Sequence, residues 1–415
     1  MFSFRLLPST ATATATAHGA RLGRLVARNV QIDTPAFLAP TSRGVVPHLS
    51  HDNLRDHTDI RGVYAALEDF IEKGIPGSPA FQFPGPLRAF TGQPSSSLLF
   101  LAARRCPPVP APATNTDHSI SMLTSVGFRE LEVNDYISCL SHLQPDAVIG
   151  LADIPAKKAG KNRMPKMVDR TELWLETLLR ITEGSRTPIF APILPIEIEQ
   201  QRLYIQSIAE EMSTRLAGLA FYNSTLVPDM PSELEGLPRF AMDDPATPHI
   251  LLQAIARGVD LFSLVFPTEA TDAGFSLEFE FPGKVEGGEE GKRKPLARDM
   301  WAGSEEMKTD TKPLVEGCNC YACRRHHRAY VCHLLAAKEM TAWVLLQLHN
   351  IHVTELFFDA VRKSIADGTF EEDCRMFAMA YENEMPKQTG GGPRHVLHVP
   401  MHGCDDQRNA NGKID

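Results

Sequence analysis

Short apolar runs alternate with helical patterns through the middle of the chain. Two runs of strand length, Ala147 to Leu151 and Pro188 to Leu194, flank a helical pattern from Val168 to Thr182. Three more strands are expected at Leu216 to Phe221, Arg239 to Met242 and Leu261 to Phe266. Strands and helices in strict alternation predict an α/β fold, in which parallel strands are joined by helical crossovers.

Two further segments are expected to be helices. One is predicted from Ile196 to Met212. The other begins at Thr247 and Pro248, a favourable N-cap and first-turn pair, and ends at Gly258. Both a (β/α)8 TIM barrel and a doubly wound sheet fit this pattern. The barrel is favoured because no glycine-rich phosphate-binding turn follows any strand.

Composition narrows the class of protein. The chain has 415 residues, of which 43% are hydrophobic and 22% charged, so it can bury a large core. Its formal net charge of -9 argues against a protein whose whole surface binds nucleic acid. No apolar run approaches the ~18 residues that a transmembrane segment needs.

The N-terminal residues allow two interpretations. Four arginines and a Thr-Ala run precede the first acidic residue, Asp33, and this composition suits a mitochondrial transit peptide. Alternatively, two strands flank an exposed Thr-Ala loop. Elsewhere, residues 107–115 form a proline-rich loop, residues 283–293 a polar insertion, and residues 386–415 a tail that we expect to be disordered.

Three of the eight cysteines lie within six residues, at Cys318, Cys320 and Cys323. Thiolates in this spacing suit a structural Zn²⁺ site, which needs a fourth ligand. His326 and His327 lie too close to Cys323 to reach around the ion easily. The remaining candidates lie further along the chain: Cys332, His333, His349 and His352.

Helix geometry limits how His349 could take part. An amphipathic helix is expected to begin near Arg325, and if it ran straight to Leu348 it would be ~36 Å long. His349 would then lie far from the cysteines. For His349 to be the ligand, the chain must double back between about Ala336 and Glu339, forming two antiparallel helices.

From Cys318 to Val353 the chain resembles the tRNA-guanine transglycosylases, also called queuine tRNA-ribosyltransferases. The shared features are the three spaced cysteines, an Arg-Ala-Tyr helix start, a Glu-Met pair and His349-Asn350. The resemblance implies that Cys318, Cys320, Cys323 and His349 bind one Zn²⁺ per chain.

The resemblance extends to most of the chain. Thr34 to Thr41 is similar to the family's first barrel strand, and Arg21 to Gly23 to the segment before it, which argues against a cleaved transit peptide. Gly258 to Phe262 and Pro267-Thr268 are similar to the late-barrel signature. The implied organisation is a (β/α)8 TIM barrel over residues 1–300, a C-terminal zinc-binding helical subdomain over 301–385, and a tail over 386–415.

The catalytic residues of the family are absent from the matching positions. The family's nucleophilic aspartate is replaced by Ser263, and the glutamine of its base-reading loop by Leu194. Its Asp-Ser-Gly-Gly-Phe-Gln loop has no counterpart, and the nearest fragment is Phe81-Gln82-Phe83. The Asp-Glu pair after the strand at Ala147 becomes Ala152-Asp153. Two phosphate-binding arginines become the acids Glu269 and Asp272.

Complete zinc ligands without catalytic residues predict a non-catalytic subunit. The resemblance implies a heterodimer with a catalytic paralogue, which exchanges guanine for queuine at the wobble position of tRNA. We therefore expect no catalytic and no organic-cofactor residues, and contact with tRNA only through the complex. We also expect a cytoplasmic location. Peripheral attachment to the mitochondrial outer membrane is an alternative expectation.

Two alternatives stay open from the sequence. The chain could be an active transglycosylase that uses Asp146, Asp153 or Asp260 as its nucleophile. It could instead be a zinc-stabilised module that binds RNA or protein and has no part in base exchange.

Overall fold

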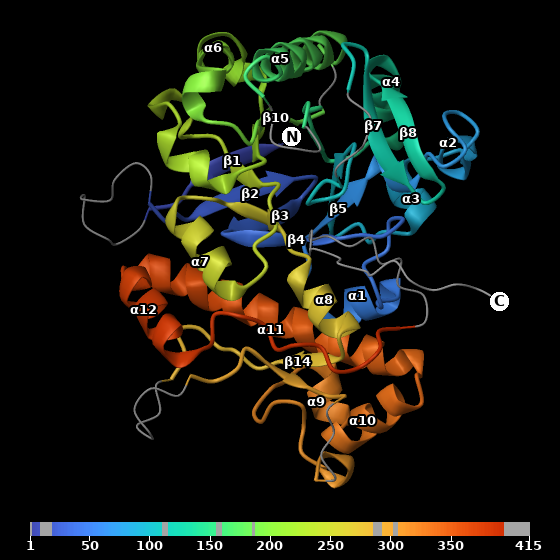
Figure 1. Cartoon of the computed structure of the whole chain (residues 1–415), viewed down its shortest axis with the longest axis vertical. Coiled ribbons are helices and arrows are strands. Elements are labelled where there is room, and N and C mark those ends of the chain that lie inside the picture. Colours follow the sequence, from blue (N-terminus) through green and yellow to red (C-terminus); the bar gives the residue numbers. More distant parts are fainter. Residues whose placement is uncertain are drawn as a thin grey trace, which may run out of the picture.

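Eight parallel strands form a closed barrel in the computed structural model (Figure 1). The structure describes residues 2–8, 19–109, 115–154, 160–184, 187–284, 293–301 and 306–393. Each barrel strand pairs with the next along the chain, and the last pairs with the first. This confirms the TIM barrel and excludes the doubly wound sheet. The strands are β4 (Ala36–Pro40), β5 (Gly62–Ala66), β6 (Leu98–Ala102), β9 (Ala147–Ile149), β10 (Ile189–Ile193), β11 (Gly218–Phe221), β12 (Arg239–Ala241) and β13 (Leu261–Ser263).

Aromatic rings fill the interior of the barrel. Tyr64, Phe100, Phe190 and Phe240 come from four different strands and meet mostly edge to face, at ring-centroid distances of 5.6 to 6.5 Å. Because the strands are covered by side chains inside and by helices outside, they are almost wholly apolar.

A three-stranded antiparallel sheet precedes the barrel, made of β1 (Ser3–Leu6), β2 (Gly23–Ala27) and β3 (Val30–Thr34). Phe2 packs edge to face on the barrel residue Phe190, at 6.0 Å between ring centroids. This corresponds to the two-strand interpretation of the N-terminus. Most of the Thr-Ala run, residues 9–18, lies outside the described residues.

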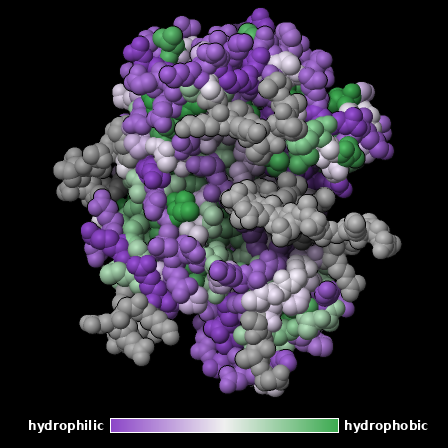
Figure 2. Space-filling model, viewed as in Figure 1, coloured by the Kyte–Doolittle hydropathy of each residue, from purple (hydrophilic) through white to green (hydrophobic). Residues whose placement is uncertain are grey.

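Helices surround the barrel, and hydrophilic side chains dominate the outer faces of α5 and α6 (Figure 2). Thr247 Oγ1 accepts a hydrogen bond from the backbone N–H of Ile250, and Gly258 adopts a φ of 92°, so the predicted cap and stop of this helix are confirmed. The helices are α1 (His51–His57), α2 (Pro79–Gln82), α3 (Leu87–Thr91), α4 (Val133–Leu143), α5 (Met164–Ile181), α6 (Arg202–Ser207), α7 (Pro248–Ala256) and α8 (Phe266–Asp272).

Several elements differ from their predicted extents: α5 begins at Met164 and not at Val168, β9 ends two residues early, and two further differences have a visible cause. The helix expected from Ile196 to Met212 is a 3-10 turn (Ile198–Gln201), then α6, then a π turn (Ile208–Met212). The Gln201 side chain bonds to the backbone of Leu194 and Ile196, which holds the start of this segment against the strand end. The strand expected to reach Phe266 stops at Ser263, because Phe266 and Pro267 begin α8.

The C-terminal part consists of β14 (Phe275–Leu277), β15 (Ala297–Asp299), α9 (Tyr321–Arg325), α10 (Arg328–Ala336), α11 (Met340–Asp367) and α12 (Phe370–Ala380). The long helix α11 joins two cores. Its first half, with Trp343 and Leu346, packs with the cysteine segment, whereas Ile351 and Phe358 pack with the barrel core. The division of the chain at residues 300 and 385 therefore stays a prediction.

The final described residues cross the C-terminal part. Gly390 lies so close to the Trp301 ring that a Cβ atom there would fall within 2.2 Å of it. Residues 394–415 of the predicted tail lie outside the described part, as do most of the polar insertion and of the proline-rich loop. In the part of the chain described here, no helix is both long and apolar enough to cross a bilayer.

Candidate metal centre and barrel mouth

Four soft ligand atoms meet in the C-terminal part. The Nδ1 atom of His349 lies 3.7 Å from the Sγ of Cys318 and 3.5 Å from the Sγ atoms of Cys320 and Cys323. All four ligand atoms lie within 4.8 Å of one another, and three of the four residues are buried. The structure thus brings together the four residues that the family resemblance assigned.

A reversal of the chain places His349 in this group. α10 ends at Ala336, Lys338 adopts a left-handed φ of 57°, and α11 begins at Met340. The turn lies where helix length required it. The preceding helix differs from its prediction, because the segment is divided at His326 and His327 into α9 and α10.

Neighbouring groups orient the ligands. Cys320 is the N-cap of α9, and its Sγ accepts a hydrogen bond from the backbone N–H of Cys323 at 3.3 Å. His349 Nε2 lies 2.9 Å from the carbonyl oxygen of Leu277, to which it donates. This bond leaves Nδ1 as the atom that faces the sulfurs, a common arrangement around metal-binding histidines.

The geometry and chemistry of the four residues fit a tetrahedral metal ion. Zn–S bonds of ~2.3 Å and Zn–N bonds of ~2.05 Å at the tetrahedral angle give an S···N separation of about 3.6 Å. The observed separations are 3.5 to 3.7 Å. Burial lowers the pKa of His349, but hydrogen bonds and charge from Cys318 and Cys323 outweigh it and raise that pKa to about 10. A cation is thus favoured between these groups, and a bound metal would replace the imidazole proton.

The other candidate ligands lie outside this group. Cys332 donates its thiol hydrogen to the carbonyl oxygen of Met300 at 3.3 Å. His326 stacks on Tyr330, with 5.4 Å between ring centroids. Among the described residues, neither of these, nor His327, His333 or His352, joins the metal-binding group.

A second candidate site is the mouth of the barrel, at the carboxyl ends of the strands, where TIM barrels carry their active sites. A cavity of about 420 Å³ opens there between the ends of β4, β5, β6 and β13 and the hairpin β7 (Ser119–Thr124) and β8 (Gly127–Glu132). Its lining includes Thr41, Tyr64, Arg105, Cys106 and Val265.

Ser263 lies at the end of β13 and is fully buried. Its Oγ atom has the Cys106 thiol as a neighbour, and no base among the described residues is placed to take its proton. Burial raises the pKa of the nearby Cys106 thiol well above its usual range, which keeps that thiol protonated. Neither side chain is an activated nucleophile.

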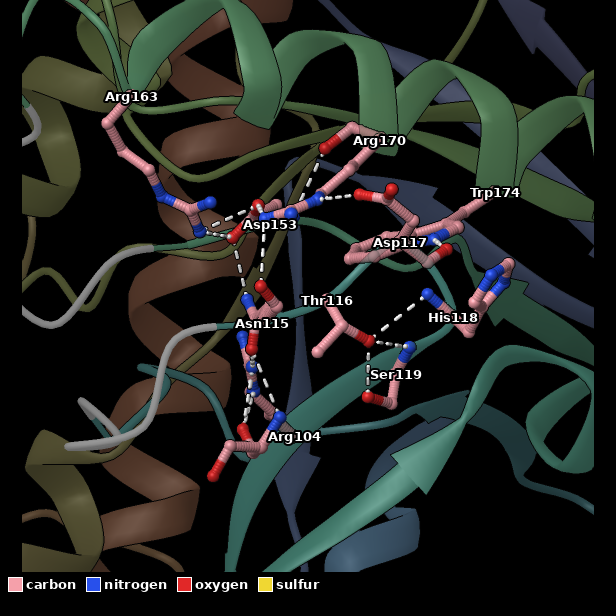
Figure 3. A network of polar contacts seen from close by, with 12 residues as sticks. Arg104, Asn115, Thr116, Asp117, His118, Ser119, Asp153, Arg163, Arg170 and Trp174 are labelled. Atoms are coloured by element: carbon pink, nitrogen blue, oxygen red, sulfur yellow. Dashed lines mark hydrogen bonds and ion pairs between the residues drawn. The ribbon is translucent and has the colours of Figure 1, made fainter.

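Asp153, after β9, is enclosed by hydrogen-bond donors (Figure 3). Arg163 donates to both carboxylate oxygens at 2.6 and 2.8 Å, Arg170 donates at 3.2 Å, and Asn115 at 2.7 Å. Arg104 in turn donates to Asn115 and to the carbonyl oxygen of Ser121. These contacts join the loop after β6 to α5 and leave the carboxylate fully buried.

The other two proposed nucleophiles lie at the wrong end of the barrel. Asp146 directly precedes β9 and pairs with Arg28 and Arg88. Asp260 directly precedes β13, is fully buried and accepts from Arg21 and from the backbone of Arg239. Amino-terminal strand ends carry stabilising residues in TIM barrels. The structure therefore argues against both as nucleophiles.

Asp272 and the Phe81-Gln82-Phe83 fragment can now be placed in the fold. The carboxylate of Asp272, one of the two acids at the positions of the family's arginines, lies 2.6 Å from Nε2 of His48. Phe81 and Gln82 lie in α2, between the second and third barrel strands, and not at a strand end. The residues that follow the third strand, β6, are Ala103, Arg104 and Arg105.

Sequence reasoning missed two carboxyl groups at the mouth. Burial raises the pKa of Glu68, after β5, and of Asp244, after β12, to about 7. Glu68 is 1% exposed and accepts a hydrogen bond from the backbone N–H of Arg105 at 2.8 Å. Both residues follow an apolar run of strand length, and this position in the sequence could have identified them as residues of the barrel mouth.

Comparisons with known proteins agree with this geometry. Residues 16–383 match the family model described as queuine tRNA-ribosyltransferase. The chain is 37% identical over 389 residues to a Schizosaccharomyces pombe protein named queuine tRNA-ribosyltransferase accessory subunit 2, covering 91% of this chain and 85% of that protein. Proteins with the same name are 28% identical in Xenopus tropicalis and 27% in Homo sapiens, each covering 85% of this chain and 95% of the relative.

Proposed function

The chain belongs to the queuine tRNA-ribosyltransferase family, and we propose that it is the non-catalytic subunit of a heterodimeric enzyme of this family. Its partner would be a catalytic paralogue that exchanges guanine for queuine at the wobble position of tRNA. Support comes from relatives named accessory subunit 2, which match most of the chain.

One observation carries the non-catalytic part of the proposal. The residue in the nucleophile position, Ser263, is buried, and among the described residues its hydroxyl has no base beside it, its neighbour being the protonated Cys106 thiol. Attack on a ribose carbon needs an ionised carboxylate or an activated hydroxyl. Asp153, the carboxylate retained after β9, is held by Arg163 and Arg170. The anticodon loop would therefore react in the barrel of the partner.

We propose that Cys318, Cys320, Cys323 and His349 bind one Zn²⁺. The ion would supply structural cross-linking and no chemistry, because all four tetrahedral positions are filled by protein atoms. It would tie α9 to α11, which also packs in the barrel core.

The partner would bind the metal-containing part, on the exposed side of α10. Tyr330 in α10 is 38% exposed and Met340, at the start of α11, is 55% exposed; His333 in α10 is exposed as well. Aromatic and methionine side chains of this kind are enriched in protein interfaces. This subunit would thus stabilise the complex and leave base exchange to its paralogue.

The test is to trap the covalent RNA adduct with each subunit separately and with the mixture. We expect adducts on the paralogue alone, and exchange of labelled guanine only when both chains are present. Native mass spectrometry should show a 1:1 complex. An adduct on this chain would contradict the proposal, and so would full exchange activity of the paralogue without it.

A further inference from the structure

A polar pocket of about 370 Å³ lies between the end of α1, α9 and the middle of α11. We call it the α1–α9 pocket; Arg55, His57, Tyr321, Arg324, Arg325 and Glu355 contribute to its lining. It is separate from the barrel mouth, whose lining shares no residue with it. None of its lining residues belongs to the proposed partner surface on α10, although that surface adjoins it, because His326 stacks on Tyr330.

The charged residues that line the α1–α9 pocket are three arginines and three acids: Arg55, Arg324 and Arg325, and Asp56, Asp59 and Glu355. Arg324 and Arg325 are exposed and form no ion pair among the described residues. Arg55 is already paired with Asp52 and Asp56. Burial raises the pKa of Glu355 to about 8, so this carboxyl is mostly neutral at pH 7 and does not offset the two arginines. In a chain with a net charge of -9, Arg324 and Arg325 are thus two local cations that remain available to a ligand.

A flat stacked surface borders these arginines. The rings of His57 and Tyr321 stack with 4.4 Å between centroids and 27° between planes. The ring of His326 lies 5.9 Å from that of Tyr321 and is tilted by 59° to it, so it is a neighbour of the stacked pair and not part of it. Tyr321 is 36% exposed, so part of its ring remains open to a ligand.

Two unpaired arginines beside an exposed aromatic ring match the chemistry of RNA. Arginines pair with phosphates, while bases stack on tyrosine and histidine rings whatever their sequence. We infer that the α1–α9 pocket binds the backbone and one unstacked base of the tRNA, outside the anticodon loop. This rests on the proposed function, because the heterodimer must hold tRNA. An acidic protein partner fits less well, since it would leave the stacked surface unused.

The first test replaces both arginines in the heterodimer, Arg324→Ala with Arg325→Ala. The affinity for tRNA should fall roughly tenfold for each arginine at 0.1 M salt, and the plot of log Kd against log salt should flatten by about 1.4 to 1.8. A matched control is Arg180→Ala with Arg215→Ala, which removes two exposed arginines from α5 and from the segment before β11. The control should bind tRNA like the wild type.

The second test separates stacking from charge. Tyr321→Ala should weaken tRNA binding by at least about fivefold with little change in salt dependence, while Tyr321→Phe retains binding. Metal content is measured in both, because Tyr321 lies next to Cys320. Photo-crosslinks from position 321 should map to nucleotides outside the anticodon loop.

Unchanged tRNA affinity in the double arginine variant, with the heterodimer intact, would overturn the inference. Loss of the heterodimer in place of tRNA binding would overturn it as well, and would assign the pocket to a protein partner. Crosslinks from position 321 that map only to the anticodon loop would also overturn the inference. If the proposed function itself is wrong, the result is distinguishable, because the wild-type chain would then form no heterodimer.

Discussion

The Nδ1 atom of His349 lies 3.5 Å from the Sγ atom of Cys320, although 29 residues separate them. Two helices with a one-residue left-handed turn at Lys338 account for this proximity. Because α11 continues into the barrel core, the same contact fastens the cysteine segment to the barrel. A structural metal here would therefore influence both the subunit's stability and its partner surface.

Replacing Cys320 with Ser should remove the metal. A serine hydroxyl is a poor Zn²⁺ ligand at neutral pH, so metal content should fall from one equivalent per chain to near zero. The melting temperature and the yield of heterodimer should fall with it. Cys374→Ser, in α12, is the control and should keep the metal. Full metal content in the Cys320 variant, measured by mass spectrometry of the metal, would refute the assignment.

Substitutions at Lys338 test whether the turn between α10 and α11 requires a left-handed backbone conformation. Its φ of 57° is disfavoured for a side chain with a Cβ and most disfavoured for a β-branched residue. Lys338→Gly should keep or slightly raise the free energy of unfolding, and Lys338→Val should lie about 1–2 kcal/mol below it. Urea unfolding measures the difference. Equal stability of the two variants would show that the turn does not require this backbone conformation.

Restoring an acid at the nucleophile position should not restore activity. Ser263→Asp places a carboxylate in a fully buried position, which should cost at least about 2 kcal/mol of stability. No covalent RNA adduct should form on the isolated variant, because the surrounding catalytic groups are still missing. Ser263→Ala serves as the stability control. An adduct on the aspartate variant would show that the barrel mouth still binds RNA productively.

Asp153→Asn should destabilise the fold. The amide cannot balance the charges of Arg163 and Arg170, so the free energy of unfolding should fall by about 2–4 kcal/mol. Asp117→Asn is a matched control in the same network, because its side chain is 65% exposed, and it should change the free energy of unfolding far less than Asp153→Asn. If Asp153→Asn abolished exchange by the heterodimer without loss of stability, a catalytic role would replace the structural one.

Glu68 should give the fold a pH dependence. Its pKa of about 7 lies above the unfolded value of 4.5, so the folded state binds this proton more tightly. The contribution of Glu68 to stability is therefore present below pH 4.5 and is lost as pH rises to about 7, by about 3 kcal/mol at most. Glu68→Gln should remove that loss. Its melting temperature should exceed that of the wild type increasingly between pH 5 and pH 8; a constant difference would contradict the shift.

Part of the fold could be read from local patterns. The central strands and their crossover helices appear as apolar runs of the right length, and Thr247 and Gly258 mark a helix by short-range backbone chemistry. β5 and β6 were not identified, because five-residue strands buried on both faces carry no alternation. Where a side chain such as Gln201 bonds to a strand end, the expected helix gives way to irregular turns.

The sequence by itself determined the metal-binding group and the loss of the nucleophile. Cysteine spacing is local, helix rise fixes the place of the turn, and the family resemblance selected His349 from several candidates. Only the tertiary structure decided the state of the charged residues. Asp153, Asp260 and Asp272 look alike in the sequence. Asp260 pairs with Arg21 and Asp272 with His48, each more than 200 residues away along the chain, whereas Asp153 pairs with the nearby Arg163. Charges are neutralised by whatever folding brings within a few ångströms, and that depends on the packing of the whole barrel.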